Sequence, residues 1–281
     1  MHPNKFPAKT TRIKVVDFDS KDTTIIHFSG AYFQPEFTNI NNAPVQKPFV
    51  VESVLFKNRN GILLNGWLIK PADSGKINIT LLHFHGNEGS LVSQYQAIVP
   101  VVKDGVQVFM FDYSGFGFSA GEATMQNVRA DALAALNYIT GRADVKNTKL
   151  VIYGQSLGGH LAAVIAADKP DKIAGLVMEG AFSSPKDMAA YTVRKSTGLG
   201  FIGRLLVKED YSAKASIKKY RKPCLIIHST EDEEVPFYMG QLLYKDANTP
   251  KEFYQIKGAH INGPRIYADS ILTKIKSMLQ Q

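Results

Sequence analysis

The feature that most constrains this chain is a serine placed between a strand-like run and a helix-like run. Ser156 lies in the pentapeptide G-Q-S-L-G at 154–158, after the apolar run 149–153 and before small apolar residues at 159–167. A strand that passes through a tight turn into a helix is the context expected of a G-x-S-x-G nucleophile. Glycines suit such a strained turn because larger side chains would collide across it. The pattern therefore predicts an exposed hydroxyl at a helix N-terminus, where backbone N–H groups can stabilise negative charge.

A serine hydroxyl becomes a good nucleophile only when a base takes its proton and an acid orients that base. Asp232 lies in an acidic loop after the strand-like run 223–228, and His260 follows the strand-like run 252–256. Among the seven histidines of the chain, His260 alone has the position that the base requires. We expect all three side chains to converge at one edge of a parallel sheet.

The acid is less sharply defined than the base. Taken alone, a carboxylate in this loop would more often be a solvated turn residue or a helix cap. The neighbours Glu231 and Glu233 also leave the choice of carboxylate open. The order of the serine, the acid and the base along the chain favours Asp232.

A loop after an earlier strand-like run, residues 78–84, supplies a further part of the expected site. Acyl transfer needs two N–H donors aimed at the developing oxyanion, one after the nucleophile and one in this loop. We expect the backbone amides of Leu157 and Asn87 to be these donors. His83 and His85 resemble a metal-binding pair, but no third group of ligands accompanies them in the sequence, so we predict no metal.

Five motifs in chain order carry a resemblance to a known family. They are H-G-N at 85–87, F-D-Y-S-G-F-G-F-S-A-G at 111–121, G-Q-S-L-G-G at 154–159, D-x-x-V-P at 232–236 and G-A-H-x-N at 258–262. The chain resembles the alpha/beta-hydrolase superfamily. More narrowly, it is similar to the branch that includes the alpha/beta-hydrolase-domain-17 depalmitoylases and serine-aminopeptidase-like proteins. The resemblance covers roughly residues 48 to 280.

The resemblance implies that Ser156, Asp232 and His260 are the catalytic residues. Two departures from the branch stand out. Ser229 occupies a position where the branch often has glycine. The Cys-rich, lipidated N-terminus of the depalmitoylases is absent from this sequence, so their membrane-protein substrates do not carry over.

The alternation of strand-like and helix-like runs predicts an α/β protein with the α/β-hydrolase fold. We expect an eight-stranded, mostly parallel sheet with helices on both faces, opened by an antiparallel hairpin of residues 50–56 and 62–69. Residues 1–47 form an N-terminal extension with short β-like runs at 13–18 and 24–28, and residues 48–281 form the hydrolase domain. The predicted helices lie near 90–103, 124–141, 157–168, 236–247 and 264–279.

The segment 181–222 is too long for a simple crossover between strands. Its middle is apolar without strand alternation, which predicts a short helical cap at about residues 183–210. We expect its apolar side chains to bind the acyl group of a substrate, although they could instead pack on the sheet edge. These candidate substrate-binding residues are Met188, Tyr191, Phe201, Ile202 and Leu205.

Composition excludes several classes of protein. The net charge of +8 is spread over separated lysines and arginines, without the dense basic and aromatic run typical of nucleic-acid binding. No apolar stretch is long enough to span a membrane. The N-terminal residues lack a signal-peptide core, which favours the cytoplasm. The single cysteine, Cys224, excludes an intrachain disulfide.

The sequence therefore predicts a serine hydrolase that cleaves a small carboxylic ester or thioester through an acyl-enzyme, without a cofactor. A serine peptidase or amidase of the same fold is the nearest alternative, and a catalytically silent binding protein is another. The glycines of Gly115-x-Gly117 resemble the fingerprint of a dinucleotide-binding oxidoreductase. No helix directly follows them, as that fingerprint requires, so this class is not supported. The sequence leaves the oligomeric state open.

Overall fold

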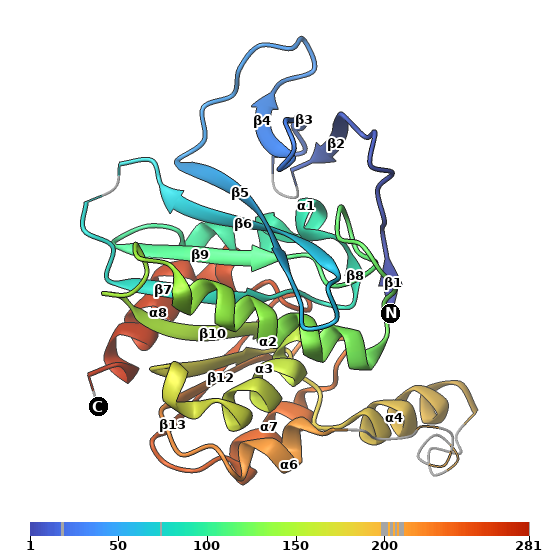
Figure 1. Cartoon of the computed structure of the whole chain (residues 1–281). Helices are drawn as coiled ribbons and strands as arrows, with labels where there is room; N and C mark the ends of the chain where they lie inside the picture. The colour runs from blue at the N-terminus through green and yellow to red at the C-terminus, as the bar shows by residue number, and fades with distance from the viewer. Residues whose placement is uncertain are drawn as a thin grey trace. The chain divides into compact units, whose positions relative to one another are not determined.

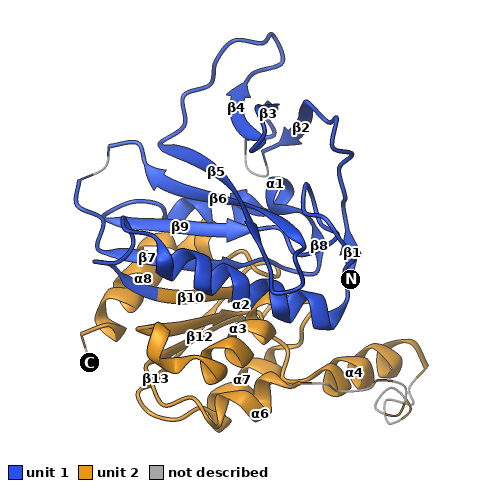
Figure 2. Ribbon diagram, viewed as in Figure 1, with its two compact units in different colours: residues 1–150 blue, residues 151–281 orange. Residues whose placement is uncertain are grey.

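The computed structural model of the chain describes residues 1–17, 20–73, 75–197, 202, 205, 207 and 211–280. Its labelled helices and strands are shown in Figure 1. The chain divides into two compact units, residues 1–150 and residues 151–281 (Figure 2). Each unit is described by itself.

The main set of strands in unit 1 has the spatial order β7-β9-β6-β5. β5 and β6 form an antiparallel hairpin, as the sequence predicts, and β9 pairs antiparallel with β6 and parallel with β7. Every residue of β7 and β9 is buried, as expected for strands covered on both faces. The bounds are β5 (Phe49–Lys57), β6 (Leu63–Pro71), β7 (Ile79–Phe84), β9 (Val106–Phe111) and the helix α2 (Met125–Gly141).

The N-terminal extension forms a small sheet of its own. Its antiparallel strands are β2 (Arg12–Val16), β3 (Thr23–Ser29) and β4 (Gln34–Thr38), and the sequence predicted only the first two. Its aromatic rings pack on the rest of unit 1. Phe28 and Phe33 contact Phe118 with centroid distances of 4.8 and 4.2 Å. The extension therefore adds apolar burial to unit 1.

The segment after β7 differs from the single helix predicted near residues 90–103. It contains the short helix α1 (Leu91–Gln94) followed by two 3-10 turns, η1 (Tyr95–Ala97) and η2 (Val99–Val101). Pro100 has no N–H to donate, so it cannot continue an α-helical hydrogen-bond ladder. A two-residue strand, β8 (Glu88–Gly89), precedes α1 and pairs with β1 (His2–Pro3).

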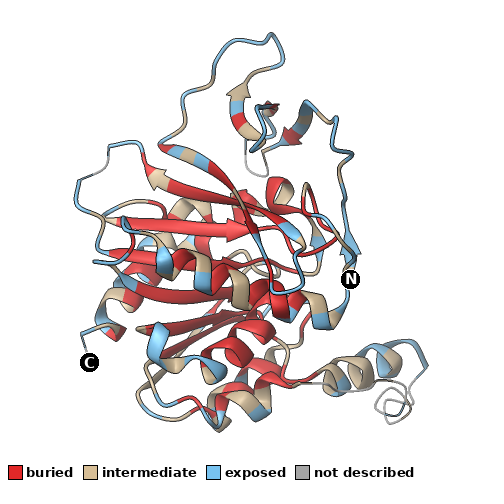
Figure 3. Cartoon of the chain, in the orientation of Figure 1, coloured by how far each residue is buried: buried red, intermediate tan, exposed pale blue. Residues whose placement is uncertain are grey.

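Unit 2 carries a wholly parallel set of strands in the order β13-β12-β11-β10. β11 and β12 are buried throughout and β10 in all but its first residue, whereas β13 is mostly half-buried. Figure 3 colours the chain by this burial. The strands are β10 (Lys149–Gln155), β11 (Gly175–Glu179), β12 (Cys224–Ser229) and β13 (Lys251–Ile256). The helices are α3 (Leu157–Asp168), α4 (Pro185–Thr197), α6 (Ala213–Ile217), α7 (Phe237–Asp246) and α8 (Gly263–Met278), with the 3-10 turn η3 (Pro170–Lys172).

The prediction of eight mostly parallel strands with helices between them is confirmed by β5, β6, β7 and β9 of unit 1 and by β10 to β13 of unit 2. The single cysteine, Cys224, is buried in β12. Among the residues that the structure describes, no helix combines the length and the apolar character needed to cross a membrane.

Candidate active site

Ser156 occupies the tight turn that the sequence predicts between β10 and α3. Its backbone has φ 56° and ψ −118°, a conformation that residues other than glycine rarely adopt. The Ser156 N–H donates a hydrogen bond of 2.9 Å to the carbonyl of Glu179 at the end of β11. This bond between neighbouring strands holds the strained turn in place.

Gly154 is required by the same turn. A Cβ atom at this position would lie 2.2 Å from the carbonyl oxygen of Gly158, which is backbone and cannot move aside cheaply. We therefore expect Gly154→Ala to destabilise the protein by about 3 kcal/mol or more, because the added methyl overpacks the turn. Urea unfolding followed by circular dichroism measures the change. Gly141→Ala is the matched control, since a Cβ there meets nothing within 4 Å, and equal losses in the two variants would contradict the steric argument.

Leu157 begins α3 directly after the serine, so its N–H lies among the first helical amides, which have no partner inside the helix. The Ser156 side chain makes no capping hydrogen bond to this helix, which leaves the hydroxyl available. Asn87, the other expected oxyanion donor, lies in unit 1 between β7 and β8 and is half-buried. Its role stays a prediction.

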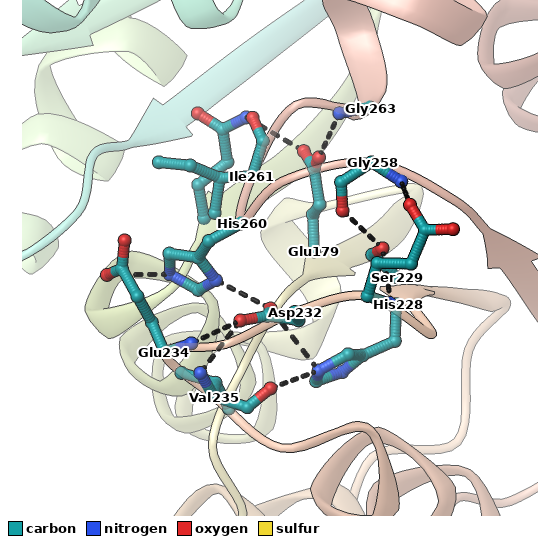
Figure 4. A network of polar contacts seen from close by, with 12 residues as sticks. Glu179, His228, Ser229, Asp232, Glu234, Val235, Gly258, His260, Ile261 and Gly263 are labelled. Carbon is teal, nitrogen blue, oxygen red and sulfur yellow. Dashed lines mark hydrogen bonds and ion pairs between the residues drawn. The ribbon is translucent and has the colours of Figure 1, made fainter.

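Asp232 lies in the loop between β12 and α7. One of its oxygens, Oδ1, accepts the N–H groups of Glu234 and Val235 at 3.0 and 2.8 Å. The other, Oδ2, lies 2.6 Å from Nδ1 of His260 and 3.5 Å from Nε2 of His228. The backbone bonds fix the carboxylate, so that one oxygen always faces the imidazole of His260 (Figure 4).

His260 lies in the turn between β13 and α8, with its side chain 7% exposed against 1% for Asp232. Because a carboxylate only accepts, the proton of their hydrogen bond lies on Nδ1 of the imidazole. Nε2 is then the basic nitrogen. It is buried, has no hydrogen-bond partner among the described residues, and lies 3.9 Å from Oε2 of the exposed Glu234.

The environment of His260 makes it a stronger base. Burial alone lowers the pKa of the imidazole, but the hydrogen bond and charge of Asp232, with the charges of Glu234 and Glu179, raise it above the usual 6.5. His228 differs, because burial lowers its pKa and its Nε2–H donates to the carbonyl of Val235 at 2.9 Å. His228 therefore stays neutral and helps to fix the loop of Asp232.

The structure separates Asp232 from its acidic neighbours. Glu231 accepts the N–H of Gly258 at 2.9 Å with Oε2, and Glu233 is exposed. Of the three carboxylates left open by the sequence, Asp232 is the one that forms a hydrogen bond with His260 in the described part of the chain. No hydrogen bond joins Ser156 to His260 within the described part of the chain, although their neighbours Gln155 and Ile261 are joined by one of 3.3 Å.

Glu179 is a residue that sequence reasoning missed. It ends the apolar strand β11 and is 1% exposed, and its carboxylate accepts three hydrogen bonds, two from β10 and one from the start of α8. A charged residue at the end of an otherwise apolar run was the available signal, because buried carboxylates are rare unless they are paired.

The predicted cap region contains α4, which projects from the rest of unit 2 in Figure 2. Met188 and Tyr191 lie on this helix and are half-buried, and no residue of α4 is fully buried. Ile202 is half-buried and Leu205 is 80% exposed. Phe201 lies outside the described residues. The helical character of residues 185–197 is confirmed, while substrate binding by these side chains stays a prediction.

Known proteins are similar to this chain in sequence. The chain matches the alpha/beta hydrolase fold family over residues 79–196. It is 32% identical over 269 residues to the protein YfhR of Salmonella typhi, a match that covers 89% of this chain and 88% of that protein. It is 30% identical over 217 residues to the alpha/beta hydrolase domain-containing protein WAV2 of Arabidopsis thaliana, covering 73% of this chain and 69% of WAV2.

A solved structure is similar in fold. The esterase Pf2001 of Pyrococcus furiosus aligns with a TM-score of 0.66 and 19% identity, covering 85% of this chain and 96% of the esterase. At that identity the likeness shows the fold alone. The match to the family and the two relatives establish that the chain belongs to the alpha/beta-hydrolase family, and the solved structure agrees with them in fold.

Proposed function

We propose that this protein is a serine hydrolase that cleaves a carboxylic ester or thioester through an acyl-enzyme on Ser156. The observation that carries the proposal is the buried pair of His260 and Asp232, 2.6 Å apart, in the same unit as a serine on a strained strand-to-helix turn. A base oriented by an acid and a nucleophile exposed by a turn are the parts that acyl transfer requires.

The reaction follows from the protonation states. Nε2 of His260 takes the proton of the Ser156 hydroxyl as Oγ attacks the acyl carbonyl, and it returns that proton to the leaving alcohol or thiol. Asp232 holds the imidazole in the tautomer with the proton on Nδ1 and stabilises the imidazolium that forms. Water then repeats the sequence on the acyl-enzyme and releases the acid. Catalytic hydrogen bonds shorten when substrate binds, so Ser156 and His260 need not be joined beforehand.

The tetrahedral intermediate carries a negative oxygen that needs N–H donors. The amide of Leu157 opens a helix of 12 residues, so its N–H adds to the positive end of the helix dipole. Removing one such donor in other enzymes costs about 10²- to 10³-fold in kcat.

The test is a panel of p-nitrophenyl esters, acyl-coenzyme A thioesters and aminoacyl-nitroanilides. We expect hydrolysis of esters or thioesters, with kcat/KM rising about fourfold for each added methylene that is buried, until the acyl pocket is filled. If the protein cleaved only the anilides, it would be an amidase and the proposed ester or thioester hydrolysis would be wrong. If kcat/KM did not change with the length of the acyl chain, the expectation of an apolar acyl pocket would be wrong.

A further inference from the structure

The carboxylate of Glu179 is held by three donors from two elements of unit 2. Oε2 accepts the Tyr153 hydroxyl at 2.8 Å and the Gln155 side-chain amide at 2.7 Å, both from β10. Oε1 accepts the N–H of Gly263 at 2.7 Å, where α8 begins (Figure 4). Gly263 leaves room for this contact, because a Cβ there would lie 2.5 Å from Oε1.

These donors fit a negatively charged carboxylate. The N–H groups of Gln155 and Gly263 only donate, so a protonated Glu179 could give its own proton only to the Tyr153 oxygen. Burial raises the pKa of Glu179 above its usual value, and the hydrogen bonds from Gln155, Tyr153 and Gly263 limit that rise. Burial also raises the pKa of Tyr153 far above its usual value, so its hydroxyl stays a donor. A buried charge with hydrogen bonds at both oxygens is the arrangement that folded proteins tolerate.

The same residue connects both halves of the proposed site. Its carbonyl accepts the N–H of Ser156 at 2.9 Å, and its side chain holds the start of α8, three residues beyond His260. Gly180, directly after Glu179, lies against the imidazole, since a Cβ there would be 3.0 Å from Cε1 of His260. Gln155 completes the connection, because its side-chain amide also donates to the carbonyl of Ile261 at 3.3 Å.

We propose that Glu179 is a positioning residue for the proposed reaction: its buried carboxylate holds the His260 turn against the Ser156 turn and stabilises the imidazolium that forms at His260. The inference rests on the proposed function. It assigns Glu179 no contact with substrate, and it predicts that the residue acts through charge as well as through shape.

The charge of Glu179 has a measurable consequence. The titratable groups that face His260 are Asp232, Glu234, Glu179 and His228. His260 must be neutral to act as base, so the reaction is lost as the pH falls through the His260 pKa, which lies above 6.5 in the unaltered protein. Removing the negative charge of Glu179 lowers that pKa, and the acidic limb of the pH profile moves to lower pH.

The experiment measures the second-order rate of labelling by a fluorophosphonate between about pH 5 and pH 9, because this rate reports the basicity of the group that activates the serine. For Glu179→Gln we expect the acidic limb to move to lower pH, and the plateau rate to fall about 10²-fold because the His260 turn is less well oriented. Circular dichroism and thermal unfolding check that the variant is folded.

Two further variants separate charge from shape. Glu179→Asp keeps the charge but shortens the side chain, so the plateau should fall while the limb stays close to that of the unaltered protein. Tyr153→Phe removes one donor and keeps the carboxylate, with the same expectation. If Glu179→Gln does not fold, these two variants carry the test, and a limb that moves to lower pH in either of them would overturn the inference.

Glu234→Gln is the matched control. It removes the same charge from the same imidazole, but the Glu234 side chain is 73% exposed, so its effect is screened by water and salt. We expect a small shift that disappears at high salt, whereas the Glu179→Gln shift persists. If the unaltered protein is not labelled at Ser156, both the proposed function and this role of Glu179 fail. If it is labelled and Glu179→Gln leaves the limb in place, the Glu179 inference alone fails.

Discussion

Replacing Ser156 with alanine should abolish labelling by a fluorophosphonate and lower kcat by roughly four to six orders of magnitude. The hydroxyl is the atom that forms the acyl-enzyme, and neither His260 nor Asp232 can replace it. The strained φ of 56° at this position supports the assignment, because a folded protein retains such a conformation where the structure around it enforces it. Mass spectrometry of the intact protein measures the labelling, and steady-state kinetics on the best ester of the panel measure kcat.

Ser212→Ala is the control for this prediction. Ser212 also stands at the start of a helix, where its hydroxyl accepts the N–H of Ala215 at 3.4 Å. Its loss should cost about 1 kcal/mol of stability and leave labelling intact. Labelling that persists in Ser156→Ala would show that another residue is the nucleophile.

Replacing Asp232 with asparagine should lower kcat by about 10⁴-fold. The asparagine side chain can turn its NH₂ group toward His260 and donate a hydrogen bond to Nδ1. The imidazole proton then lies on Nε2, so Nε2 has no free lone pair to take the serine proton. KM should change little, because Asp232 is buried behind the imidazole.

The adjacent acids are matched controls for Asp232. Glu233→Gln should have little effect because Glu233 is exposed. Glu231→Gln should cost a small factor, since a glutamine oxygen can still accept the N–H of Gly258. A loss near 10⁴-fold in Glu231→Gln, with Asp232→Asn close to full activity, would move the role of the acid to Glu231.

Local sequence patterns determined most of the fold. The strand before Ser156 and the helix after it follow from apolar periodicity and from glycines at the turn, which act within a few residues. The hairpin of β5 and β6 follows in the same way. The prediction of a single helix near residues 90–103 was wrong. Pro100 has no N–H for the helical hydrogen bonds, and the apolar residues of this segment are compatible with helix and turn alike.

The sequence also named Ser156, Asp232 and His260, because each stands in a short motif after a strand. It favoured Asp232 over Glu231 and Glu233 only by the order of motifs along the chain, since neighbouring carboxylates are chemically alike until a partner is near. The tertiary structure adds a hydrogen bond between one oxygen of Asp232 and Nδ1 of His260, which the sequence could not show.

Glu179 shows what only the tertiary structure could decide. Its donors come from Tyr153, Gln155 and Gly263, and the last lies 84 residues further along the chain. No local pattern encodes such a meeting, because it depends on which strands pair and where α8 begins. A hydrogen bond depends on distances of a few ångströms in space, and the folded sheet alone brings these groups that close.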